Sequence, residues 1–442
     1  MLFSLLLLAC SGSPGAPSAP AGGAPQGAPR GPPPPGSPQG PPPGGQGPNG
    51  MAGVSGAKMQ DPSGFPHFHD QPAPEGPAIT GVGTWGAPVK LTETKGGGYR
   101  PQVAAGPDGL LHALYYERTD AGDLIRHRTS RDGATWTAPA PLGLTDNRNW
   151  GPDLVARADG SVVVVFDHAR ADFSSVGYVT TWRGGTWSTP EALTADDGGE
   201  IGSGHVADAA GDQLAYVWIG KPMSPTEHFR ARWRWFKDGA WSAAKDFTDG
   251  AADAWHTNVE RRPDGSVLAG YDVGTGGAET VLYVVDGRDG AFGTPENLSA
   301  SSTAGERPHF AFGADGTDHL TYFRKEMGRP MHVYVRSGKP GAWAAPEEPS
   351  TGYGGYHFDP DIAINKDGVR CLVWGWDAGE DAEMVYSLNR GSGWEPPKKI
   401  ADIDYGKPGL ASIVDDATGA FHIVWNQGVR GQNEVYYARL TP

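Results

Sequence analysis

The chain has 442 residues, including 67 glycines, 40 prolines and two cysteines, and a formal net charge of −15. This acidic balance argues against a nucleic-acid partner, because proteins that bind nucleic acid present a basic face. If Cys10 is acylated, as its context indicates, Cys371 has no partner and a disulfide within the chain is excluded. Cys371 lies in the apolar run VRCLVWGW, which predicts a buried, inert thiol.

The N-terminus, MLFSLLLLAC, is an apolar run that is too short to span a membrane. It resembles the lipobox of bacterial lipoprotein signal peptides, with residues 1–9 as the signal and Cys10 as the lipidated residue. An ordinary secretory signal with a chance cysteine is the alternative. The lipoprotein hypothesis implies an outer-membrane or cell-surface location in a bacterial envelope, with the lipid as the only membrane contact.

Residues 10–78 are dominated by proline and glycine, in runs such as GPPPPG and GPPPGG. Such a composition cannot bury a core, so we expect a disordered tether with polyproline character. From about residue 79 onward tryptophan, tyrosine and valine become frequent. The sequence therefore predicts one folded domain over residues 79–442.

One short motif recurs through this domain, for example as ATWTAPAPL at 134, GTWSTPEAL at 185 and GAWAAPEEP at 341. Its seven copies follow each other at intervals of about 51 residues, which is typical of a propeller blade. The aromatic residues of the copies are Trp85, Trp136, Trp187, Trp241, Phe292, Trp343 and Trp394.

Each unit between two motifs has the pattern of short strands. In PQVAAGPDGLLHALYYE, runs of β-branched and aromatic residues flank a PDG turn. A third strand follows, the motif supplies a fourth, and no useful helix signal occurs. We predict an all-β, seven-bladed β-propeller of four-stranded antiparallel blades, acting as a monomer. Residues 81–91 are expected to close the ring as the outer strand of the last blade.

The copy Ser130-Arg131-Asp132-Gly133-Ala134-Thr135-Trp136 resembles the Asp box of sialidases and related bacterial neuraminidase-repeat propellers. The likeness extends over the folded part, although the other copies are degenerate. It implies that Asp132 forms a turn between the third and fourth strands of a blade, while Trp136 packs between sheets. A short carboxylate beside glycine is also a local turn former. Chemistry is therefore expected at the other end of the blades.

Charged and aromatic residues recur where the innermost strand of each unit begins, and they are expected to face a central funnel. A concave surface with converging polar groups is what a binding site requires. The candidate ligand-binding residues are Arg100, Trp150, His168, His205, Trp255, His256, Arg307, His309, His357, Trp376 and Lys407. The candidate catalytic residues are Arg100, His256, Arg307, Arg324, Glu326, His357 and Asp359. The second connections of the units add Asp167 and Asp272.

Aromatic faces stack on sugars and arginine pairs with carboxylates, so a glycan or polysaccharide is the expected ligand. Three hypotheses stay open: a sialidase-like hydrolase, a lyase of uronic-acid polysaccharides, and a non-catalytic propeller that binds glycan or protein. The resemblance to seven-bladed lyases implies histidine and tyrosine as acid and base. No cofactor is expected, and no metal, because no tight ligand spacing such as H-x-x-x-H occurs.

Overall fold

The computed structural model describes residues 73–442, except 94–96, 173, 196–198, 225, 275–279, 299–304, 325–330, 404 and 430–431. The described residues belong to one compact unit. The expected signal 1–9, the lipidation site Cys10 and the linker up to residue 72 lie outside them. Within the described ranges, no helix is both long and apolar enough to cross a membrane.

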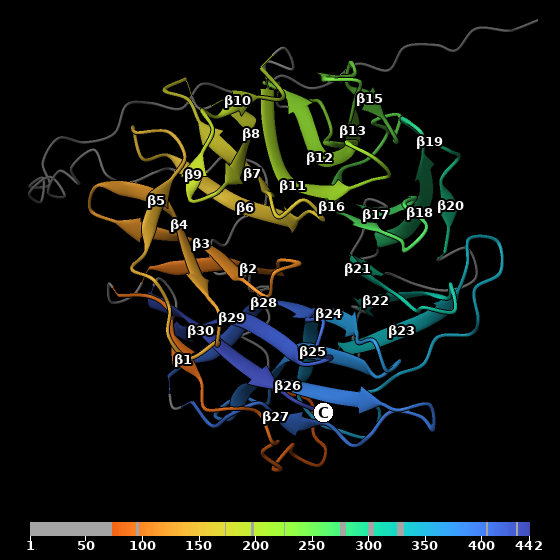
Figure 1. Ribbon diagram of the computed structural model, residues 1–442. Coiled ribbons are helices and arrows are strands. Elements are labelled where there is room, and N and C mark those ends of the chain that lie inside the picture. The colour runs from red at the N-terminus through yellow and green to blue at the C-terminus, as the bar shows by residue number, and fades with distance from the viewer. Residues whose placement is uncertain are drawn as a thin grey trace, which may run out of the picture. The chain divides into compact units, whose positions relative to one another are not determined.

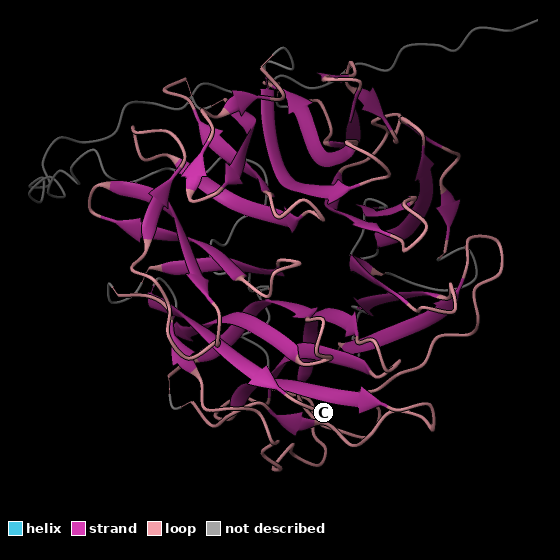
Figure 2. Cartoon of the chain, viewed as in Figure 1, coloured by secondary structure: helices cyan, strands magenta, loops and turns pink. Residues whose placement is uncertain are grey.

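Seven antiparallel sheets follow one another in chain order through the described residues. Figure 1 shows them arranged around a common centre, from the orange strands β2 to β5 through green to the blue strands β28 to β30. Figure 2 shows that strands and loops make up this part of the chain. The predicted all-β, seven-bladed propeller is confirmed.

In each of the first four blades, the innermost strand comes first in the chain. Blade 1 contains β2 (Gly98–Ala105), β3 (Leu111–Thr119), β4 (Gly122–Ser130) and β5 (Ala140–Leu142). Blade 2 contains β6 (Asn149–Ala156), β7 (Val162–Ala169), β8 (Ser175–Arg183), β9 (Thr186–Trp187) and β10 (Glu191–Ala192). Blade 3 contains β11 (Gly199–Asp208), β12 (Leu214–Pro222), β13 (Arg230–Lys237), β14 (Ala240–Trp241) and β15 (Lys245–Asp246). Blade 4 contains β16 (Ala254–Arg261), β17 (Val267–Gly274), β18 (Thr280–Arg288), β19 (Ala291–Phe292) and β20 (Glu296–Asn297).

The last three blades follow the same order. Blade 5 contains β21 (Glu306–Phe312), β22 (Asp318–Arg324) and β23 (His332–Gly338), and a bridge between Val335 and Glu347 takes the place of its outer strand. Blade 6 contains β24 (Tyr356–Ile364), β25 (Arg370–Asp377), β26 (Ala382–Asn389) and β27 (Lys398–Lys399). Blade 7 contains β28 (Lys407–Asp415), β29 (Phe421–Val429), β30 (Gln432–Leu440) and, from the other end of the domain, β1 (Val89–Lys90).

The position of a strand in its blade explains its sequence. The second strands, such as β7 with the sequence VVVVFDHA, are buried at nearly every position. They read as continuous apolar runs because neighbouring blades cover both faces. The innermost strands, such as β2, alternate between buried and partly exposed residues. Each innermost strand forms the edge of its sheet that lies nearest the common centre (Figure 1).

The N-terminal strand closes the ring, as predicted, but only part of the segment 81–91 pairs with blade 7. Val89 lies opposite Tyr437 of β30, and Gly86 donates its N–H to the carbonyl of Arg439. The preceding residues instead follow the outer strand of blade 6, where Lys399 donates its N–H to the carbonyl of Gly81. Between these two stretches, the buried Trp85 ring packs into the core shared by blades 6 and 7.

The turn that contains Asp132 connects β4 to β5. Its carboxylate accepts hydrogen bonds from the N–H groups of Ala134 (2.9 Å) and Thr135 (2.7 Å), which together with Ser130 lower the pKa of Asp132. The Trp136 ring meets Tyr437 of blade 7 edge-on. Because β4 runs away from the start of β2, this turn lies at the opposite end of the blade from the positions expected to carry chemistry.

Cys371 is buried in β25, and burial raises the pKa of its thiol. An apolar environment disfavours the thiolate, which is the reactive form. The expected burial of the Cys371 thiol is therefore found.

Candidate functional site

All seven innermost strands carry a β-bulge near their start. A bulge places two residues opposite one partner residue and re-aims a side chain. The register shifts lie between Tyr99 and Gln102, Trp150 and Asp153, Gly202 and His205, Ala254 and Thr257, Glu306 and His309, Phe358 and Asp361, and Pro408 and Ala411. In each blade, the bulge thus redirects one side chain at the same position of the repeat.

Local sequence explains the bulge in four of these seven strands. Arg100, Gly151, Arg307 and Asp359 each precede a proline, which has no N–H to donate to the ladder. All four residues adopt a left-handed backbone conformation, with φ between 46° and 58°. This conformation is unfavourable for residues other than glycine, so at the two arginines and the aspartate it persists against its intrinsic cost.

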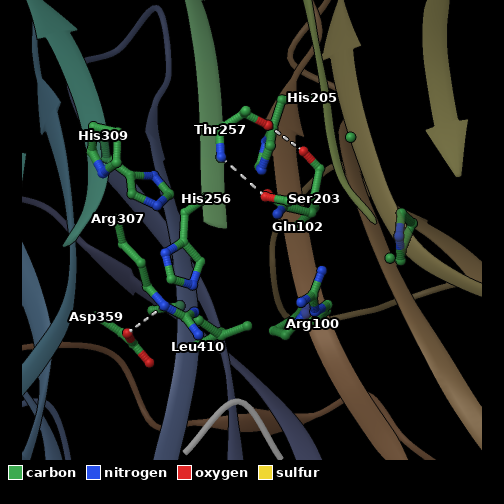
Figure 3. Close-up of a pocket in the computed structure, with 16 residues that line it drawn as sticks. Arg100, Gln102, Ser203, His205, His256, Thr257, Arg307, His309, Asp359 and Leu410 are labelled. Carbon is green, nitrogen blue, oxygen red and sulfur yellow. Dashed lines mark hydrogen bonds and ion pairs between the residues drawn. The ribbon is translucent and has the colours of Figure 1, made fainter. Parts of the chain in front are cut away.

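The re-aimed residues and their neighbours line one pocket at the mouth of the channel (Figure 3). The space between them measures about 650 Å³, including the part that opens to solvent. The side chains in its lining include Arg100, Gln102, Ser203, His205, His256, Thr257, Arg307, His309, Asp359 and Leu410. Six blades contribute these side chains, and blade 2 contributes Gly151 and Pro152.

The two arginines of the pocket differ in their partners. Nε of Arg307 lies 3.1 Å from Oδ1 of the buried Asp359, and its backbone N–H binds Asp272. Arg100 makes no hydrogen bond or ion pair of this kind within the described residues. Burial lowers the pKa of Arg100, and the charge of Arg307 acts in the same direction. Arg100 therefore offers a partly buried guanidinium whose donors are available to an anion.

Three histidines of the pocket each turn Nδ1 toward a carboxylate. The pairs are His205 with Asp153 (3.5 Å), His256 with Asp272 (2.8 Å) and His309 with Asp361 (3.3 Å). Such a partner fixes the orientation of the imidazole and leaves Nε2 as the nitrogen directed elsewhere. The His256 pair is the shortest, and Asp272 is fully buried and also binds the N–H groups of His256 and Arg307.

Two carboxyl groups near the arginines have raised pKa values. Burial raises the pKa of Asp359, against the opposing charges of Arg307 and His256. Burial also raises the pKa of Asp167 to about 7, against the charge of Arg100. Both groups can therefore hold a proton in a pH range where an ordinary aspartate does not.

The structure brings together Arg100, His205, His256, Arg307, His309 and Asp359 from the predicted set, and it places the other described members of that set outside the pocket. His357 and Trp376 are fully buried, where His357 accepts from Trp374 and Trp376 donates to Gly354. His357 lies before the bulge in β24, and Trp376 is its partner on β25. Both side chains are therefore buried in the blade and do not reach the pocket.

The remaining predicted residues are engaged outside the pocket. Nζ of Lys407 lies 2.7 Å from Asp377, His168 binds Asn149, and the Arg324 guanidinium stacks on Tyr334. The tryptophans that precede two of the bulged residues, Trp150 and Trp255, are partly buried and do not line the pocket. Glu326 lies outside the described residues.

Sequence reasoning missed Ser203, Thr257, Asp153 and Asp361. Three of these residues, together with His205 and His309, stand directly after a bulge at the same offset in their repeat. Measuring the repeat from the bulged strand rather than from the motif would have found them. In the described ranges, no group of three or more His, Cys, Asp or Glu residues is arranged to hold a metal ion.

No family model and no curated protein sequence matches this chain. Among solved structures, a polysaccharide lyase of the ulvan-lyase family PL25 bound to -[GlcA(1-4)Rha3S]- matches over 83% of this chain and 95% of its own, with 11% identity and a TM-score of 0.55. A protein of unknown function from Dyadobacter fermentans matches over 82% and 99%, with 14% identity and a TM-score of 0.52. The arabinanase of Penicillium chrysogenum superimposes less well, over 82% and 98%, with 12% identity and a TM-score of 0.49. At these identities the likeness to the first two structures establishes the propeller fold alone.

Proposed function

We propose that the pocket binds the carboxylate of an acidic sugar, of the uronic-acid type, through Arg100 with the help of Arg307. The observation that carries this proposal is the partly buried Arg100 guanidinium, which has no carboxylate partner within ion-pair distance in the described residues. An anion that enters the pocket meets this charge where water screens it poorly. The acidic surface of the whole chain makes such a local positive site selective rather than general.

We further propose that the pocket cleaves such a glycan by β-elimination. His256 is the base, since Asp272 holds its Nδ1 and leaves Nε2 to take the proton from the carbon next to the sugar carboxylate. Arg100 stabilises the negative charge that develops on that carboxylate. The bond to the leaving oxygen then breaks, and a second imidazole, from His205 or His309, gives that oxygen a proton.

The number of carboxyl groups in the pocket favours elimination over hydrolysis. Most glycosidases use two carboxyl groups on opposite sides of the scissile bond. Among the described residues that line the pocket, Asp359 is the only acid, and it is paired with Arg307. The polysaccharide lyase with the same fold supports this choice only as an analogy of fold.

The test is a panel of uronic-acid polysaccharides and matched neutral polysaccharides. Elimination creates a carbon–carbon double bond conjugated with the carboxylate, so ultraviolet absorbance and reducing ends should rise together. His256→Gln should abolish both signals and keep binding, whereas Arg100→Met should weaken binding. Reducing ends without absorbance would indicate a hydrolase, and tight binding with neither signal would indicate a lectin-like role. No preference for acidic over neutral glycans would refute the proposed carboxylate site.

We propose separately that the protein is a lipoprotein anchored through Cys10 to a bacterial envelope, at the outer membrane or cell surface. The proposal rests on the sequence of residues 1–10 and on the proline-rich and glycine-rich segment that follows. Labelled palmitate should be incorporated into the full chain and not into the Cys10→Ser variant. Equal labelling of both chains would refute the anchor.

A further inference from the structure

Side chains join the inner ends of neighbouring blades around most of the ring. These contacts run from a polar side chain of one blade to the backbone N–H or the charged side chain of another. They are Val206 N to Asp153 (2.8 Å), Thr257 N to Ser203 (3.2 Å), Arg307 N to Asp272 (2.9 Å), Arg307 to Asp359 (3.1 Å), Ile413 N to Asp361 (3.0 Å) and Val103 N to Ser412 (3.3 Å). Between blades 1 and 2 the described residues offer only Arg100 facing Asp167, which attract each other without a hydrogen bond or ion pair.

Asp167 is an unusual acid. It is 1% exposed, and neither of its carboxylate oxygens has a hydrogen-bond partner within the described part of the chain. Burial of an unpaired carboxylate is strongly unfavourable unless a partner or a proton neutralises it. Because the described residues supply no hydrogen-bond donor to either oxygen, this carboxyl group depends on the nearby charge or on protonation.

Gly151 provides the space in which the two groups face each other. A β-carbon on Gly151 would lie 3.1 Å from Oδ2 of Asp167 and 3.6 Å from Nη1 of Arg100. Among the charges of the described residues, that of Arg100 is the one that acts noticeably on Asp167. Arg100 in turn faces Tyr116, whose pKa is raised by burial so that it stays neutral, and also Arg307 and Asp359.

We propose that Asp167 is the exchangeable counter-ion of Arg100, so that binding of a sugar carboxylate to Arg100 is coupled to the uptake of one proton by Asp167. The inference rests on the proposed function of the pocket. In the empty pocket, Arg100 balances the ionised Asp167. A second carboxylate on the same guanidinium repels Asp167 in a poorly screened site, and like charges raise a carboxyl pKa. Asp167 then takes a proton from solvent and stays neutral while the ligand is bound.

Asp359 does not compete for this role, although its pKa is also raised. Its carboxylate keeps Arg307 at 3.1 Å, and the charges of His256, His309 and Arg100 also act on it. Those charges hold Asp359 in its ionised form more firmly than Arg100 alone holds Asp167. The proton is therefore expected at Asp167.

The coupling predicts how affinity depends on pH. Burial already raises the pKa of Asp167 to about 7, so a proton is partly present at neutral pH and must be taken up above it. Affinity for an acidic sugar should then fall as pH rises above neutrality, approaching about tenfold per pH unit. The Asp167→Asn variant carries a neutral side chain of the same shape. It should bind without this pH dependence, and more tightly than the natural chain at alkaline pH.

Calorimetric titration with galacturonate in two buffers of different ionisation enthalpy counts the protons taken up. At about pH 8 the natural chain should take up close to one proton per sugar, and Asp167→Asn should take up almost none. The matched control is Asp212→Asn, which removes the same charge from a fully exposed turn and should keep the uptake. The uncharged methyl ester of galacturonate should bind much more weakly and with no proton uptake, and this comparison needs no variant.

The possible outcomes separate the two proposals. Binding of galacturonate without proton uptake, or uptake that persists in Asp167→Asn, overturns the coupling and leaves the carboxylate site standing. Equal uptake for galacturonate and its methyl ester overturns the coupling even if the variant fails to fold. No binding of galacturonate at any pH overturns the carboxylate site and the coupling with it.

Discussion

Deletion of residues 79–92 is expected to unfold the whole propeller, because this segment closes the ring. Ile79, Trp85 and Leu91 are 1%, 8% and 0% exposed and lie in three different parts of the core. Complete burial of one such side chain stabilises a protein by about 1.5–3 kcal/mol. The deletion therefore removes roughly 6 kcal/mol, a large share of the roughly 5–15 kcal/mol that stabilises a typical domain. It also leaves β30 as an unpaired edge that favours aggregation.

Chemical denaturation followed by tryptophan fluorescence measures this loss. A circular permutant that begins at residue 97 and carries residues 79–92 behind Pro442 on a flexible linker should recover most of the stability, since closure needs the segment and not its connection. Truncation to residue 73 is the control, and it should leave the transition unchanged. A deletion of 79–92 that unfolds at the same denaturant concentration as the control would refute the closure argument.

Three further predictions concern individual side chains. The free energy of unfolding of Asp167→Asn, relative to that of the natural chain, should rise by about 3 kcal/mol from about pH 5 to about pH 8. The reason is that the natural chain loses stability as pH rises toward about 7, the raised folded-state pKa of Asp167. Identical pH dependence of the two unfolding free energies would contradict this. Asp289→Gly should increase stability by about 1 kcal/mol without affecting uronate binding, as relief of its left-handed backbone predicts, whereas Arg100→Gly should abolish binding and also remove the charge that balances Asp167; an Asp289→Gly variant without a gain in stability would show that the strain argument fails. His357→Gln should lower stability by about 2 kcal/mol and leave sugar affinity intact, since its imidazole is buried away from the pocket. A loss of sugar affinity in a folded variant would show that His357 takes part in the binding site.

The repeat made the architecture readable from the chain. The interval of about 51 residues and the turn signals inside each unit predicted strand order, blade number and closure, because they depend on local turn chemistry and on a period that one sequence displays. The innermost strands begin within a few residues of where the repeat placed them, except β11, which starts earlier, at Gly199. The lipid anchor at Cys10 stays a prediction, as it lies outside the described residues.

The pocket was only partly readable. The repeat located the right stretch in every blade, yet Arg307 and His357 looked equally suited to the site. A one-residue step along a strand moves a side chain to the other face, and a bulge changes that alternation by one residue. Which of two neighbours faces the pocket was therefore set by the register between strands, which composition and period do not specify.

The amino-acid sequence by itself determined the architecture of the blades, since strands, turns and the closing segment follow from local patterns repeated seven times. Only the tertiary structure decided which side chains meet. Asp272 reaches His256 within one blade and the Arg307 backbone in the next, while Arg100 and Asp167 face each other across Gly151. The contact of Asp272 with Arg307 and that of Arg100 with Asp167 join residues from different repeats, and their geometry depends on how the blades pack around the axis. The physical reason is that charge pairing depends on distances of a few ångströms between chain segments that lie far apart in the sequence.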